Sequence, residues 1–229
     1  MSQGESPLLT HTIDAAFPVH GDRIPVDHGE ALYVALSRLP QVGPWLRAAT
    51  SVGIAPIPGR EADEGDEGAG LIALTADSRL TLRLSAAELP NILPLSGQSL
   101  VVDGHRIDIG PPSVLALKSE PELYAHRVAI RGGEDPARFD AGIRRQLDEL
   151  EIRAEPIRGE RRLLRLGDHA IVTHGLTVTA LSDEDSLHLQ EAGLGGRRKM
   201  GCGVFVRPNE EASLHRGGSW RRRENGGDV

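Results

Sequence analysis

The order in which strand and helix patterns follow one another constrains the fold of this chain more than any other feature. Residues 8–17 alternate loosely between apolar and polar side chains, which predicts a strand. Residues 30–39 place leucine and alanine at helical spacing, and Pro40 ends that helix. A tight turn at Asp77–Ser78 and a capping-box pattern at Ser85 and Glu88 come next. The strands predicted in this half after the first helix are 71–76, 79–84 and 98–109.

The second half repeats this order. Asp135 is the predicted N-cap of a helix that starts at Pro136, and its apolar stripe consists of Phe139, Ile143, Leu147 and Leu150. A strand at 122–131 precedes the helix, and a meander over 152–181 with a hairpin turn at Gly167–Asp168 follows it. Ser182 and Asp185 cap a last helix that ends at Gly193, before a final strand at 203–207.

Each half therefore reads β-α-β-β-α-β, the order of a ferredoxin-like unit. The predicted fold class is α+β, with two tandem ferredoxin-like (RRM-like) units and a glycine-rich loop before the last strand. We assign residues 1–115 to the first unit and 116–208 to the second. Residues 59–70 carry five acids and four glycines and are predicted to be a surface insertion, and 209–229 a disordered tail.

Composition excludes several classes of protein. The 229 residues are 39% hydrophobic, which is enough for a core. The single cysteine, Cys202, excludes an intrachain disulfide and a multi-cysteine zinc site, and no cluster of histidines and carboxylates stands out, so we predict neither metal nor cofactor. No apolar run is long enough to cross a bilayer, and the start lacks a signal-peptide pattern. The prediction is a cytoplasmic protein without a membrane partner.

Charge is distributed unevenly along the chain. The net charge is −7, yet residues 194–229 contain eight Lys or Arg against four Asp or Glu. Because salt screens a charge beyond about 8 Å, the local excess matters more than the total. A basic site on an acidic body can capture a polyanion and discourage binding elsewhere.

The segment GLGGRRKMGCG, residues 193–203, is the most specific motif. It runs from a helix to a strand, which excludes a nucleotide P-loop and a dinucleotide fingerprint. Paired glycines permit positive φ angles and close backbone approach, and amides in such a turn attract anionic oxygens. Arg197, Arg198 and Lys199 add full charges at its centre. The alternative is a flexible turn with solvated cations.

Three features resemble the CRISPR-associated endoribonucleases that cut repeat RNA, members of the repeat-associated mysterious protein (RAMP) superfamily. Segment 193–203 is similar to their Gly-hydrophobic-Gly, five residues, Gly-hydrophobic-Gly loop. DHGEALYVALSRLP, residues 27–40, resembles the histidine and LYxAL helix of several branches. The doubled ferredoxin-like order spans nearly the whole chain.

The resemblance implies metal-independent attack of a ribose 2′-OH on its own 3′-phosphate, which leaves a 2′,3′-cyclic phosphate and a 5′-OH. Histidine suits the proton transfers because its ordinary pKa is about 6.5. On this basis the catalytic candidates are His28, Tyr33 and Lys199. Tyr33 is equally a packing residue against the neighbouring sheet. The candidates for binding the RNA are Arg197, Arg198, Gly195, Gly196, Gly201 and Gly203.

Seven aromatic residues are too few for base stacking on a strand, so a repeat hairpin recognised through phosphates and shape is the predicted partner. Subunits of an RNA-guided surveillance complex are the other implied partners. The main alternative is a non-catalytic RNA-binding subunit of such a complex. A two-histidine phosphodiesterase is set aside because no histidine has Ser or Thr two residues on. A pure protein-interaction module leaves the glycine pattern unexplained.

Overall fold

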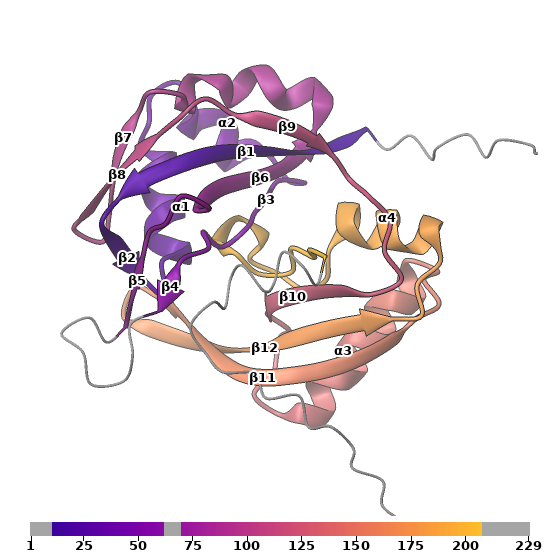
Figure 1. The fold of residues 1–229 in the computed structure, drawn as a ribbon. Helices are drawn as coiled ribbons and strands as arrows, with labels where there is room; N and C mark the ends of the chain where they lie inside the picture. Colours follow the sequence, from indigo (N-terminus) through magenta and orange to yellow (C-terminus); the bar gives the residue numbers. More distant parts are fainter. Residues whose placement is uncertain (1–10, 62–69, 208–229) are drawn as a thin grey trace, which may run out of the picture.

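The computed structural model of the protein describes residues 11–61 and 70–207. Figure 1 shows two layers of antiparallel sheet, with the first half of the chain above the second. The predicted fold class is confirmed. Residues 62–69 of the predicted insertion at 59–70 lie outside the described residues, as does the predicted tail from 209. Within the described ranges, none of the helices has the length and apolar character that crossing a membrane requires.

The first unit is built on one main sheet with the strand order β3-β6-β1-β8-β7. An additional strand, β9 (Ser113–Ala116), pairs with part of β1. Helices α1 (Gly29–Ser37) and α2 (Gly43–Ala48) belong to this unit. The strands of the sheet are β1 (Thr12–Gly21), β3 (Gly53–Ile54), β6 (Arg79–Ser85), β7 (Ser99–Val102) and β8 (His105–Ile109).

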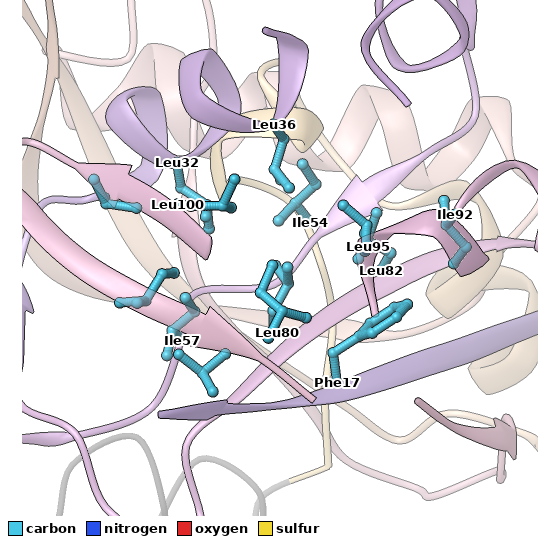
Figure 2. Close-up of a cluster of buried hydrophobic side chains, with 14 of the residues drawn as sticks. Phe17, Leu32, Leu36, Ile54, Ile57, Leu80, Leu82, Ile92, Leu95 and Leu100 are labelled. Atoms are coloured by element: carbon cyan, nitrogen blue, oxygen red, sulfur yellow. The ribbon is translucent and has the colours of Figure 1, made fainter. Parts of the chain in front are cut away.

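Alternation along β6 explains how this sheet acquires two different faces. Leu80, Leu82 and Leu84 are buried in a cluster that also contains Phe17 and Leu36 (Figure 2). The residues between them, including Arg83, point to the opposite face. That face looks toward the second unit, so the sequence of one strand builds both the core and the contact between the units.

Several details of the first unit differ from the sequence prediction. The first strand, predicted at 8–17, is β1 at Thr12–Gly21, and residues 8–10 lie outside the described residues. The strand predicted at 71–76 is short, and β5 (Leu71–Ala73) pairs with β2 (Arg23–Pro25) and β4 (Arg60–Glu61) in a separate small sheet. The predicted strand 98–109 is a hairpin, because Asp103 and Gly104 both take positive φ angles. The predicted capped helix is a pair of 3₁₀ turns, η1 (Ala86–Asn91) and η2 (Leu93–Leu95), without a hydrogen bond from the Ser85 side chain.

The second unit follows its prediction more closely. The Asp135 side chain accepts from the Ala137 amide at 2.9 Å, and the predicted stripe of the helix buries Phe139, Ile143 and Leu147. The predicted final strand is reduced to a single bridge between Tyr124 and Val206. The elements are β10 (Leu123–Val128), α3 (Pro136–Glu149), β11 (Glu155–Leu166), β12 (His169–Thr179), α4 (Asp183–Ala192) and η3 (Arg198–Met200), with the sheet order β10-β12-β11.

Arg83 of β6 fastens the two units together. Its guanidinium donates to both carboxylate oxygens of Asp14, at 2.8 and 2.7 Å. The same group donates to the carbonyls of Gln190 at 3.2 Å and Phe205 at 2.6 Å, both in the second unit. Because the side chain is 3% exposed, these bonds are shielded from water and fix the two sheets relative to each other.

Candidate active site

Several distant segments of the chain meet at the start of α1. Four successive residues, 27–30, all make contacts with other parts of the chain. Asp27 and Glu30 accept hydrogen bonds from the second unit, His28 holds the segment around residue 57, and Gly29 lies against the glycine-rich loop. The histidine and the cationic loop predicted from sequence therefore converge.

His28 is buried, and both of its ring nitrogens have backbone partners. Nδ1 lies 2.8 Å from the Pro25 carbonyl oxygen, and the Ile57 amide donates to Nε2 at 2.9 Å. Because a carbonyl only accepts, Nδ1 carries the proton, and Nε2 presents its lone pair. The ring is thus held as the neutral Nδ1–H tautomer.

Burial is the main reason that the pKa of His28 falls from 6.5 to about 4. The hydrogen bond to Pro25 opposes this shift, the charge of Arg127 adds to it, and the charge of Asp27 opposes it. At neutral pH the ring is therefore uncharged and in the state that accepts a proton. Its low pKa makes it a weak base as long as it stays buried.

This pKa predicts how stability changes with pH. The unfolded chain binds a proton at His28 near pH 6.5 and the folded chain only near pH 4, so stability is full above pH 6.5 and falls as the pH drops toward 4. Between pH 7 and pH 5, we expect His28 to account for a loss of about 2 kcal/mol. Urea unfolding of the wild type and of His28→Gln at the two pH values measures this difference. Equal pH dependence in both proteins would contradict the assignment.

The carboxylates of Asp27 and Glu30, on either side of His28, accept hydrogen bonds from the second unit. Asp27 Oδ1 accepts from Arg127 of β10 at 2.6 Å, and Oδ2 accepts from the Arg165 amide of β11 at 2.7 Å. Glu30 accepts from the Gly167 amide, at the tip of the β11–β12 hairpin, at 2.6 Å. The hairpin therefore docks on the helix that follows His28.

The glycine-rich loop contacts α1 through its own backbone. A side chain at Gly29 would run into the Met200 carbonyl oxygen, so only glycine permits this approach. Within the loop, a Cβ at Gly203 would meet the Leu194 carbonyl, and one at Gly193 would meet the Gly203 carbonyl. The two Gly-x-Gly pairs are thus packed against each other.

The amides of the glycines predicted to bind RNA are engaged within the chain. Gly195 donates to Gln146 at 2.7 Å, Gly196 to Ala129 at 3.0 Å, Gly201 to Arg198 at 3.4 Å, and Gly203 to Arg127 at 2.7 Å. The expectation that these amides face an anion therefore does not hold in this structure. The physical reason is that a loop so tightly folded uses its own carbonyls, and those of β10, as acceptors.

The three cations of the loop occupy different environments. Arg197 is exposed, with φ +67°. Lys199 donates from Nζ to the Arg47 carbonyl in the last turn of α2 at 3.2 Å. Arg198 turns inward against the backbones of Gly53 and Gly193, where burial and the charge of Arg83 lower its pKa to about 10. Arg197 is presented to solvent, and the RNA contact of Arg198 stays a prediction.

Tyr33 and Cys202 both belong to the packing around this site. Tyr33 is half-buried and packs against the core of the first unit, one turn after Gly29. Cys202 is buried, which raises the pKa of its thiol to about 12 and keeps it protonated at neutral pH. Among the residues described, no three His, Cys, Asp or Glu side chains are grouped as a metal site.

A cleft between the two units lies next to His28. Thr81 and Arg83 line it from the first unit, and His126 and Val204 line it from the second. A smaller pocket reaches His28, Gly29 and Gly201, and it shares Ala55, Pro56 and His126 with the cleft. Ala55, Pro56 and His126 therefore lie between the cleft and the pocket that His28 lines.

Sequence reasoning did not single out Asp27, Arg127 or Arg83. Arg83 lies on the polar side of the alternating strand RLTLRLS, where no local pattern indicates its burial. A usable signal exists for Arg127, because it interrupts the largely apolar strand LYAHRV. A charged residue at such a position is buried only when it is paired. Asp27 adjoins the candidate histidine, but nothing in the sequence indicates its two partners.

Comparisons with known proteins identify the family of the chain. The sequence model of the family described as "Cas6 Crispr" matches residues 13–210. The chain is 33% identical over 202 residues to the CRISPR-associated endonuclease Cas6 of Myxococcus xanthus (strain DK1622). The alignment covers 88% of this chain and 84% of that relative. The chain belongs to the Cas6 family of CRISPR-associated endonucleases.

Solved structures of Cas6-type proteins share the fold. A CRISPR-associated protein Cas6 superposes with a TM-score of 0.58 at 12% identity, over 86% of this chain and 98% of that one. A Cas6-related protein from Pyrococcus furiosus gives 0.58 at 14%, over 86% and 97%. A RAMP protein described as binding different RNA substrates gives 0.59 at 13%, over 85% and 98%. At these identities the likeness concerns the fold alone.

Proposed function

We propose that this Cas6-family protein cleaves CRISPR repeat RNA without a metal ion, by attack of a ribose 2′-OH on the adjacent 3′-phosphate. The observation that carries the proposal is the contact between the start of α1 and the glycine-rich loop at Gly29 and Met200. It brings the segment that carries His28 and the glycine-rich loop to one junction. Family membership supports the endonuclease activity.

In the proposed reaction, the 2′ proton passes to Nε2 of His28 as the 2′ oxygen bonds to phosphorus. The bond from phosphorus to the 5′ oxygen breaks, and that oxygen takes up a proton from the imidazolium or from water. The Pro25 carbonyl keeps the other ring nitrogen protonated and oriented. Arg197 and Lys199 supply positive charge for the phosphorane, a contribution on the order of 3 kcal/mol for a well-placed donor.

The substrate must displace the Ile57 amide from Nε2. Breaking this hydrogen bond costs about 1 kcal/mol net. Ile57 is also buried in the core of the first unit, so RNA binding has to offset the loss of its packing as well. Ala55 and Pro56 lie between the cleft and the pocket that His28 lines, so displacement of segment 55–57 opens His28 toward RNA bound in the cleft. A repeat hairpin and a surveillance complex that retains the product are the partners we propose.

The decisive experiment incubates purified protein with a repeat transcript in excess chelator. We expect cleavage to proceed, to leave a 2′,3′-cyclic phosphate and a 5′-OH, and to stop when a single 2′-deoxy substitution precedes the cut. Dependence on magnesium, or cleavage of the 2′-deoxy substrate, would overturn the mechanism.

The second candidate is a non-catalytic RNA-binding subunit. The observation that favours it is that both nitrogens of His28 are occupied by backbone groups. This candidate predicts that the wild-type protein binds the repeat tightly and leaves it intact under all the conditions above.

A further inference from the structure

Asp27 joins the His28 segment to two separate places in the second unit. Its Oδ1 accepts from the Arg127 guanidinium at 2.6 Å and its Oδ2 from the Arg165 amide at 2.7 Å. The Arg127 side chain is 8% exposed and that of Asp27 21%. The bond to Arg127 is partly buried and the bond from the Arg165 amide is exposed; because the two run in different directions, together they fix the plane of the carboxylate and with it the backbone that leads into His28.

The other contacts of His28 do not provide this link. Its ring bonds to Pro25 and Ile57, which both belong to the first unit. The β11–β12 hairpin instead reaches α1 through Asp27 and, at its tip, through Glu30. Asp27 is therefore the residue through which β10 and β11 together set the position of the histidine.

Asp27 also balances a positive charge that lies beside the His28 ring. Arg127 and His126 approach from β10, and Asp27 precedes the ring on its own segment. The charge of Arg127 lowers the pKa of His28 and the charge of Asp27 raises it. Removing the carboxylate leaves the cation unopposed beside the ring.

We propose that Asp27 is a positioning residue for His28: its carboxylate holds the start of α1 between Arg127 and the end of β11, so that ring and hairpin keep one relative placement during RNA cleavage. The inference rests on the proposed function. Asp27 itself contacts neither the RNA nor the transferred proton.

The test compares Asp27→Asn with the wild type in single-turnover cleavage of a repeat transcript. We expect the rate to fall about 10- to 100-fold, since small misplacement of a reacting group costs this much, while the Kd for the RNA stays unchanged. The acid limb of the pH–rate profile moves to lower pH, because Arg127 is no longer balanced. A merely structural role would not move that limb, and an unchanged rate and profile would overturn the proposal.

Asp140→Asn is the matched control. Asp140 pairs with Arg158 at 2.9 Å, at the other end of the same hairpin, and both side chains are more exposed than those of the Asp27 pair. The substitution Asp140→Asn removes one carboxylate from an arginine–aspartate pair that is remote from His28. We expect its rate and profile to equal those of the wild type, and a matching loss in both variants would assign the effect to the hairpin in general.

A double variant keeps the test possible if Asp27→Asn alone does not fold. Asp27→Asn with Arg127→Gln leaves no uncompensated charge, so we expect a folded protein with a wild-type acid limb and a rate that is still low. Recovery of the full rate would show that only charge balance matters and would overturn positioning.

Nuclear magnetic resonance of the imidazole separates this inference from the proposed function. In the wild type, we expect Nδ1 of His28 to carry the proton, and in Asp27→Asn we expect the ring to titrate at lower pH. If the wild type does not cleave RNA, the proposed function fails while this measurement still tests Asp27. If the wild type cleaves and the ring titrates identically in both proteins, the inference alone fails.

Discussion

Replacing His28 by glutamine is expected to lower the single-turnover cleavage rate about 10³-fold, within the range that general acid–base catalysis contributes. Glutamine is the sharpest substitution, because its amide oxygen can accept the Ile57 amide bond that Nε2 accepts in the wild type. It has no basic nitrogen, so it cannot take the 2′ proton. Folding and RNA affinity should therefore survive while the chemistry is lost. Filter binding and a gel-based cleavage assay measure the two separately.

His174→Gln is the matched control for this variant. His174 is a buried histidine on β12 whose Nε2 lies 3.1 Å from the Gly133 carbonyl and whose ring packs on Phe139. It belongs to the core of the second unit, so its loss should leave cleavage at the wild-type rate. If His28→Gln cleaves as fast as this control, His28 is purely structural and the proton acceptor is another group.

The sequence predicted the elements whose signals are local. The Asp135 cap, the apolar stripe of α3 and the turn at Gly167–Asp168 all lie where expected, because each depends on residues within a few positions of one another. The doubled unit follows from the order of these elements. Pairing between strands that are distant in the sequence is harder to predict from local patterns. The pairing of β5 with β2 and β4, rather than with the strand that follows it, was therefore not predicted.

The sequence predicts where the candidate site lies but not which way its side chains point. His28 and the glycine-rich loop were expected at one place, and Gly29 does touch the Met200 carbonyl. That His28 and Arg198 turn inward depends on segments 55–57 and 53, which no local pattern connects to them. Whether a charged or titratable side chain at a junction of units is buried depends on which distant segment of the chain packs against it. A single sequence does not show which segment that is.

Replacing Gly203 by alanine is expected to lower the free energy of unfolding by about 3 kcal/mol. Gly203 has φ +64°, which costs a side chain roughly 1–2 kcal/mol, and its Cβ would also meet the Leu194 carbonyl. That oxygen belongs to the backbone, so relieving the overlap requires a shift of the loop, at a further cost of about 1–3 kcal/mol. Gly203 also donates to the Arg127 carbonyl at 2.7 Å, so a shift reaches the Asp27 pair as well.

Gly97→Ala separates the two causes. Gly97 has φ +80° in the first unit, and a Cβ there would have nothing within 4 Å, so its replacement should cost only the backbone term of roughly 1–2 kcal/mol. Urea unfolding of both variants measures the difference, which is the part due to the interlocked glycine pairs. Equal losses would mean that the loop relaxes freely and that its glycine spacing does not serve packing. A larger loss at Gly203 would show instead that the spacing GLG, five residues, GCG serves packing, because the two backbones lie so close that no Cβ fits between them.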